Sequence, residues 1–148
     1  MNNTGISTFD RTVQTTVEWL NEIMDELPTN DRQKAYRVLR ATLQTLRDRL
    51  TVEEATDLGA QLPMLVRGFY YEGWNPTGKP EKLRTLDEFL DRVEESFPRG
   101  MDVDSRRAVE VVFGLLGDRI SEGELEDVQR MLPKPVRQLW PRSASAST

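Results

Sequence analysis

The chain of 148 residues carries 20 basic and 25 acidic side chains and contains neither histidine nor cysteine. Without these two residue types there is no imidazole base, no thiolate nucleophile, no disulfide, and no histidine or cysteine ligand for a metal. The remaining candidate bases are carboxylates, lysine and tyrosine, and no catalytic motif joins them. We therefore expect no enzyme activity, no catalytic or cofactor-binding residues and no metal site.

Charge and hydropathy set further limits. A net charge of −5, spread over both halves, disfavours nucleic acid as the main partner. The apolar runs are far shorter than the roughly 20 residues of a membrane span. Residues 1–5 lack the basic and apolar regions of a signal peptide. We expect one cytoplasmic domain that binds neither nucleic acid nor membrane.

Four helices are predicted in the first half of the chain. Apolar residues at spacings of three and four indicate two long helices. Thr51 and Glu54 fit a capping box that starts a third helix, and Leu62-Pro63 ends it before a short fourth helix. The apolar positions of the four helices include Val13, Val17, Leu20, Ile23, Met24, Leu27, Ala35, Val38, Leu39, Leu43, Leu46, Leu50, Leu65, Val66, Phe69 and Tyr70.

A loop and a second set of helices follow. Two prolines and a glycine make residues 75–84 a connector loop. Thr85 and Glu88 fit a capping box at the start of the next helix, and Ser121 and Glu124 fit another. A Leu-Pro pair again interrupts the helical pattern near the end. The apolar positions here include Leu86, Phe89, Leu90, Val93, Phe97, Ala108, Val109, Val112, Phe113, Leu116, Ile120, Val136, Leu139 and Trp140.

The two halves are related by an internal repeat. With an offset of 70, residues 18–70 align with residues 88–140 without a gap, and 13 of the 53 pairs are identical. The repeat predicts an all-α fold in which two pseudo-symmetric repeats of about four helices each form one compact helical bundle.

The predicted boundaries follow from this repeat. The first repeat spans residues 8–74, the connector residues 75–84 and the second repeat residues 85–140. The small polar tail, residues 141–148, is expected to be disordered. A single repeat of about 60 residues would be marginally stable, so we expect both to pack as one structural domain.

An ordered set of motifs resembles a known family. Residues 48–63 (DRLTVEEATDLGAQLP) and 118–133 (DRISEGELEDVQRMLP) each join a helix end, a capped turn and a closing Leu-Pro. Residues 67–74 (RGFYYEGW) lie between them. Over about residues 8–140 the chain resembles the bacterial "domain of unknown function 2267" family. The resemblance implies a small all-helical fold, a bacterial origin and no established activity, so it supplies no catalytic residues.

One apparent nucleotide-binding motif is rejected. Residues 73–80 (GWNPTGKP) have the spacing of a phosphate-binding loop, but Pro80 stands where that loop needs a hydroxyl for Mg²⁺. No strand is predicted before the motif, and Pro76 removes an amide from the phosphate nest. We therefore expect no nucleotide site here.

The best candidate surface is an aromatic cluster beside an arginine. Phe69, Tyr70, Tyr71 and Trp74 lie close to Arg67 in the sequence, and tyrosine, tryptophan and arginine are enriched at interface hot spots. Phe69 and Tyr70 align with apolar residues of the second repeat, which favours the core for these two. Arg67, Tyr71 and Trp74 are the candidate partner or ligand surface, and the alternative is that they fill the seam between the repeats.

Duplicated charges have two interpretations. Asp48, Arg49, Glu54 and Asp57 recur in the second half at the same offset of 70. They could line a symmetric site for a cation or an acid–base pair. Helix capping and the helix dipole are the simpler explanation, and we adopt it.

A basic stripe is also weighed. Arg37, Arg40, Gln44 and Arg47 are predicted to follow the outer face of the second helix and could touch RNA or phosphate. The interleaved aromatic residues of a single-strand binder are missing. We expect a solvated helix face.

These observations favour a non-enzymatic protein-interaction or adaptor module. Its partner would be another protein or a second copy of the chain in a homodimer. The alternative is a small-molecule-binding regulatory protein with a pocket between the two repeats, near Arg67, Tyr71 and Trp74. A flat, exposed apolar patch would favour the partner surface, and an enclosed cavity would favour the ligand.

Overall fold

The fold is known from a computed structural model that describes residues 4–141. Apart from Pro141, the predicted disordered tail lies outside the described residues. Within residues 4–141 there are eight helices and no strand, so the all-α prediction is confirmed. The helices are α1 (Ser7–Glu26), α2 (Arg32–Arg49), α3 (Val52–Ala60), α4 (Met64–Tyr71), α5 (Leu86–Glu95), α6 (Ser105–Arg119), α7 (Glu122–Met131) and α8 (Lys134–Arg137).

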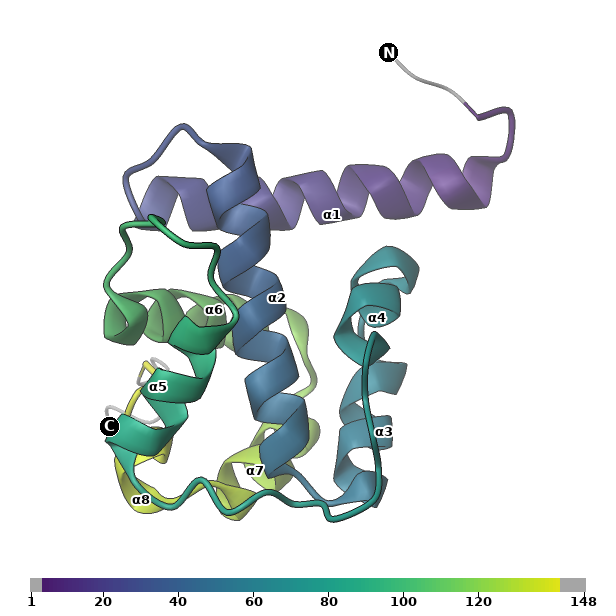
Figure 1. Cartoon of the computed structure of the whole chain (residues 1–148). Coiled ribbons are helices and arrows are strands. Elements are labelled where there is room, and N and C mark those ends of the chain that lie inside the picture. Colours follow the sequence, from purple (N-terminus) through teal and green to yellow (C-terminus); the bar gives the residue numbers. More distant parts are fainter. Residues whose placement is uncertain (1–3, 142–148) are drawn as a thin grey trace, which may run out of the picture.

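Helix α2 stands at the centre of the bundle (Figure 1). It packs against α1, α4, α5 and α6, while α3 packs against α4 and α7. Helix α1 crosses one end of α2, and its N-terminal end extends past α4 (Figure 1). None of the helices in the described chain combines the length and the apolar character needed to cross a membrane.

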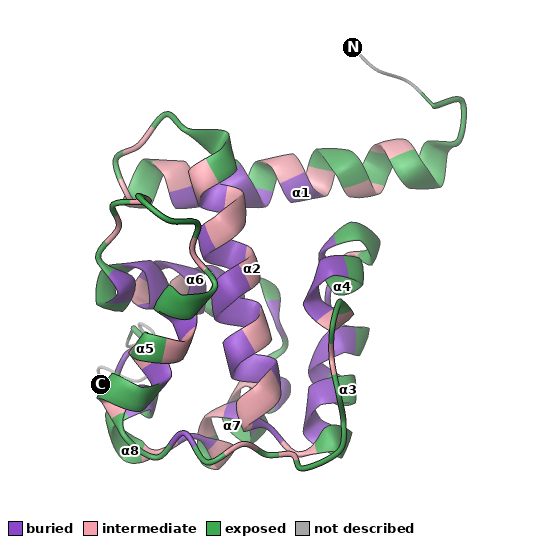
Figure 2. Cartoon of the chain, viewed as in Figure 1, coloured by how far each residue is buried: buried purple, intermediate pink, exposed green. Residues whose placement is uncertain are grey.

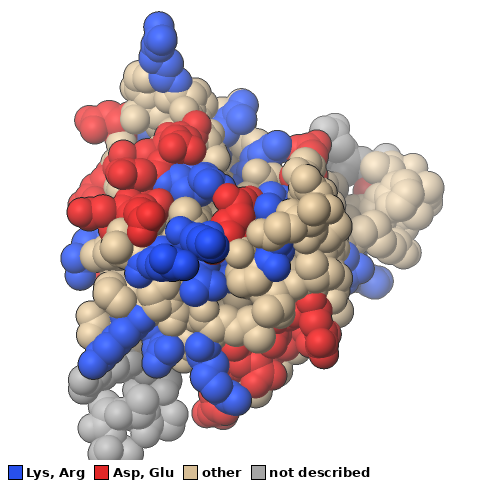
Figure 3. Space-filling model, turned by 60° about the horizontal axis from the view of Figure 1, so that its bottom comes forward, with Lys and Arg blue, Asp and Glu red and all other residues tan. Residues whose placement is uncertain are grey.

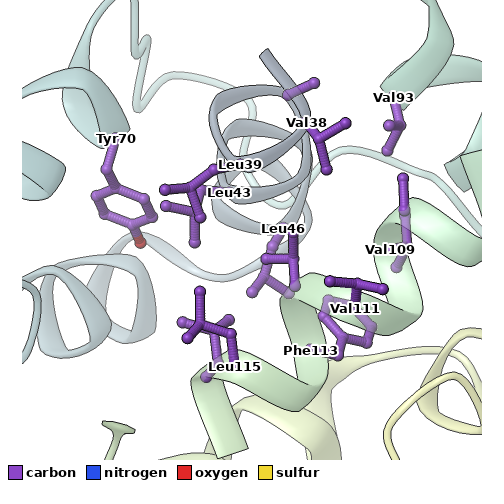
Figure 4. Close-up of a cluster of buried hydrophobic side chains, with 14 of the residues drawn as sticks. Val38, Leu39, Leu43, Leu46, Tyr70, Val93, Val109, Val111, Phe113 and Leu115 are labelled. Carbon is purple, nitrogen blue, oxygen red and sulfur yellow. The ribbon is translucent and has the colours of Figure 1, made fainter. Parts of the chain in front are cut away.

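The core lies between α2 and α6 because their apolar residues occupy more than one face. Figure 2 shows buried positions along most of α2 and α6, whereas the start of α1 is largely exposed. In Figure 4, Leu39, Leu43 and Leu46 of α2 lie between Tyr70 on one side and Val109 of α6 on the other. All five of these side chains are fully buried. The two central helices therefore form one continuous core.

The predicted helix ends are largely correct, with one informative difference. The Thr85–Glu88 capping box is complete, because each side chain accepts from the backbone amide of the other residue. In α3 and α7 the cap hydroxyl accepts from the amide three residues on, but the capping box is not completed by the glutamate. The prediction was thus wrong for the side chains of Glu54 and Glu124, which turn elsewhere.

Helix order repeats at the predicted offset. Helices α3 and α7 begin 70 residues apart, as do α4 and α8. Two contacts between the halves are also related by this offset. The Gln61 side chain hydrogen bonds with Ser121, and the Thr51 hydroxyl contacts the sulfur of Met131. Gln61 and Met131 lie 70 residues apart, and so do Thr51 and Ser121. Superposition of the halves as pseudo-symmetric repeats stays a prediction.

The connector between α4 and α5 is a loop tied to the end of α2. The Glu81 amide donates to the Asp48 carbonyl, and the Glu81 carboxylate pairs with Lys79 at 2.9 Å and with Arg92 at 2.8 Å. The hydrogen bonds from Arg92 and Lys79 lower the pKa of Glu81 to about 2 despite its partial burial. Lys79 is thus engaged by carboxylates, in agreement with the rejected phosphate-loop motif.

The Glu81→Gln variant should be less stable than the wild type at pH 7, by about 1 kcal/mol. Ionised Glu81 stabilises the fold above its ordinary value of 4.5, and this contribution is lost as the pH falls towards 2. The difference between the two proteins in urea unfolding should shrink across that window. Glu95→Gln is the control, because Glu95 pairs with the same Arg92 from an exposed position. An equal loss in both variants would contradict the role of Glu81.

Candidate functional site

Arg67, the first of the predicted surface residues, is bound to its own chain. Its guanidinium donates to the carbonyl oxygens of Gly59 and Leu62, at 2.8 and 2.7 Å. Arg137, its counterpart at offset 70, donates to Gln129 and Leu132 in the same way. Because the last carbonyls of a helix lack partners within the helix, these arginines hold the ends of α3 and α7.

Tyr71 and Trp74 form an aromatic stack at the end of α4. The ring of Tyr71 lies 4.9 Å from that of Tyr70 and 5.4 Å from that of Trp74. The Tyr71 hydroxyl covers Gly59 so closely that a Cβ there would collide with it. Trp74 Nε1 is buried and has no acceptor among the described residues. Both rings therefore pack within the first half, and the prediction that they serve a partner stays untested.

Trp74→Ala should lower the free energy of unfolding by about 2 kcal/mol, because the indole packs against Tyr71 and the core. Trp74→Phe keeps most of the ring contact and should lose less than half of that amount. Chemical denaturation of the two variants measures both values. If Trp74→Ala were as stable as the wild type, that result would instead favour the partner-surface prediction.

The expected solvated face was wrong for the C-terminal part of the basic stripe on α2, where Gln44 and Arg47 contact α4. Arg47 is 4% exposed, and its guanidinium donates to the carbonyl of Tyr70 at 2.7 Å. Gln44 donates to the Phe69 carbonyl, and Arg40 pairs with Glu72. These polar groups hold α4 against α2. On the face shown in Figure 3, basic and acidic side chains form small mixed groups.

An apolar groove lies where α1, α2 and α4 meet, and we call it the α1–α4 groove. It encloses about 470 Å³. The Thr12 hydroxyl of α1 accepts from the Leu65 amide of α4 and joins its two walls. Val13 was expected in the core, but 48% of its surface is exposed at the groove. The lining residues are Val13, Thr16, Val17, Leu20, Tyr36, Arg40, Leu65, Gly68, Phe69 and Glu72.

The groove is bordered by an exposed apolar surface that sequence reasoning missed. The described chain exposes six large hydrophobic side chains, and five of them belong to the start of α1 or of α4. These five are Ile6, Phe9, Val13, Met64 and Leu65. The available signal was the apolar pair Ile6 and Phe9, which continues the α1 stripe beyond the residues assigned to the core.

Glu54 and Glu124 meet where α3 contacts α7. They occupy equivalent positions in the first turns of their helices, 70 residues apart, and a carboxylate oxygen of one lies within 4.8 Å of a carboxylate oxygen of the other. Glu54 is 7% exposed and Glu124 is 9% exposed. Asp57 lies one turn further along α3 and brings a carboxylate oxygen within 4.8 Å of the other two. The structure thus joins three of the duplicated acids in what we call the acidic cluster.

The environment of the acidic cluster favours a protonated carboxyl. Burial, the hydrogen bond with Glu54 and the negative charges of Glu54, Asp57 and Asp127 raise the pKa of Glu124 to about 8. The groups acting on Glu124 are all acidic. In the described chain, none of the three cluster carboxylates forms a salt bridge. The cluster therefore holds a proton at neutral pH unless another positive charge replaces it.

In the presence of a chelator, the wild type should become less stable relative to Glu124→Gln as the pH rises from 4.5 to 8. Folded Glu124 keeps its proton until about pH 8, whereas the unfolded chain releases it near 4.5. The glutamine variant has no proton to lose, so its advantage should grow by about 1 kcal/mol or more across the window. Denaturation at several pH values measures this advantage.

The control is Glu122→Gln, an exposed change in the same helix turn. It should leave the wild-type pH dependence in place. A pH-independent difference between the wild type and Glu124→Gln would contradict the shared-proton interpretation.

Comparison with known proteins supplies a family. Residues 16–139 match the model of the family described as "Uncharacterized conserved protein (DUF2267)". No curated protein matches the chain.

Proposed function

The chain belongs to the uncharacterised DUF2267 family, and we propose that it is a non-enzymatic protein-interaction module that docks through the α1–α4 groove. The observation that carries the proposal is the concentration of exposed apolar side chains beside this groove. Large exposed apolar patches on soluble domains mark interaction sites. A site on α1 and α4 leaves the central core of α2 and α6 undisturbed.

The occupant that we propose for the α1–α4 groove is a second copy of the chain. A groove between helices is suited to an amphipathic helix with apolar anchors at positions i, i+3 and i+7. Ile6, Phe9 and Val13 have this spacing, and each is 47–48% exposed. The same molecule therefore carries both a groove and a helix that fits it, and a twofold axis would let each copy dock into the other.

The size of the surface supports a stable contact. Each of the five exposed apolar side chains would bury its remaining surface, which contributes about 1 kcal/mol per side chain. Both copies contribute in a twofold dimer. The α1 helix has 20 residues and is about 30 Å long, so its exposed first turns can reach a neighbouring molecule without a change in the bundle.

The small-molecule alternative has less support. The described chain has the α1–α4 groove and an open hollow formed by residues at the end of α1 and in the loop after it. Arg67, Tyr71 and Trp74 line neither of these two, and both belong to the first half. The pocket between the repeats stays a prediction without an observation that favours it.

Val13→Glu should convert a dimer of the wild type into a monomer, because it places a charge at the centre of the proposed contact. Sedimentation velocity over roughly a hundredfold dilution measures the change. Glutamate forms helices at least as well as valine, so the melting of the monomer should not suffer.

Val52→Glu is the matched control, because Val52 is the one large exposed hydrophobic side chain of the described six outside this surface. It should leave the association unchanged. A wild-type protein that stays monomeric at the highest concentration would contradict the second copy as the occupant, and so would an unaltered Val13→Glu dimer.

A further inference from the structure

The acidic cluster lacks the structural role that would explain it. Glutamates at the third position of a helix ordinarily complete a capping box, as Glu88 does in α5. In α3 and α7 this box is not completed, although the cap hydroxyls are in place. Glu54 and Glu124 instead point at each other, where their like charges oppose burial.

Two carboxylate oxygens in the cluster have no partner. Oε2 of Glu54 and Oε2 of Glu124 are buried and accept no hydrogen bond from the described residues. Both side chains are more than nine-tenths buried. An unpaired polar atom in such a position costs about 1–3 kcal/mol, and more when it carries charge. A bound positive ion would remove this cost for both oxygens together.

The geometry suits a cation that prefers oxygen ligands. One oxygen from each of Glu54, Asp57 and Glu124 lies within 4.8 Å of the other two. Ca²⁺, with bonds of about 2.3–2.6 Å and flexible coordination, tolerates such a loosely spaced set of oxygens more readily than Mg²⁺, which needs near-ideal octahedral geometry at about 2.0–2.1 Å. Asp57 is exposed, so the cluster opens to solvent on its side and leaves room for water as a further ligand.

The second half does not duplicate this third ligand. Asp127 is the counterpart of Asp57, and its carboxylate pairs with Arg130 at 3.3 Å. The nearest other titratable groups are on α4. Burial and the acidic residues nearby raise the pKa of Tyr70, whose hydroxyl donates to the Ala55 carbonyl. Burial raises the pKa of Tyr71, Arg67 lowers it and Asp57 raises it.

We propose that Glu54, Asp57 and Glu124 bind a divalent cation of the size of Ca²⁺ at the contact between α3 and α7. The ion joins the first half of the chain to the second.

The test is a calorimetric titration of the chelator-treated full chain with CaCl₂ and, in parallel, with MgCl₂. We expect Ca²⁺ to bind more tightly than Mg²⁺ and to raise the melting temperature. Asp57→Asn should weaken Ca²⁺ binding roughly tenfold or more, because it removes a charged ligand.

The control is Asp127→Asn, which removes the same charge at the duplicated position outside the cluster. It should change Ca²⁺ affinity by no more than about threefold, through screened long-range charge alone. Glu54→Gln serves as a second test, since its amide can still hydrogen bond with Glu124 while a ligand charge is lost.

Three outcomes would overturn the proposal. The first is the absence of heat and of thermal stabilisation at low-millimolar Ca²⁺. The second is equal affinity in Asp57→Asn and Asp127→Asn. The third is full Ca²⁺ binding by a folded Glu54→Gln variant.

Discussion

The enclosure of α2 is the constraint on which the rest of the structure depends. Helices α1, α4, α5 and α6 all pack against it, so its apolar residues could not be confined to one stripe. Where the surrounding helices meet α2 through polar atoms, Gln44 and Arg47 donate to the backbone carbonyls of α4. A buried guanidinium needs such acceptors, and the α4 helix end needs donors. One contact meets both requirements and fixes α4 against the core.

The position of α4 in turn determines what remains open. Once α4 is held by α2, its start lies beside the N-terminal half of α1, where the Leu65 amide reaches the Thr12 hydroxyl. The beginning of α1 extends past this point with no further helix to cover it (Figure 1). The apolar surface proposed for docking is therefore exposed because the start of α1 extends past the helices that pack against the rest of α1.

The acidic cluster shows why a motif identified correctly can still mislead. Thr51-x-x-Glu54 and Ser121-x-x-Glu124 mark the starts of α3 and α7, as predicted, and the hydroxyls cap them. The motif alone does not predict that the starts of α3 and α7 will face each other. When they do, the glutamates face one another in a buried contact and are no longer available as caps. Thr85 and Glu88, which have no such neighbour, form the complete box.

The sequence by itself determined the all-α class, the two helix breaks at Leu62-Pro63 and Leu132-Pro133, the order of the helices and the family. These features depend on spacing and on residues within one turn of each other, so local chemistry is enough. Only the tertiary structure decided that Arg47 is buried, that Val13 is exposed and that Glu54 meets Glu124. Each of these depends on contacts between segments far apart in the chain. The free energy of such contacts comes from burial, which the pattern of a single helix cannot report.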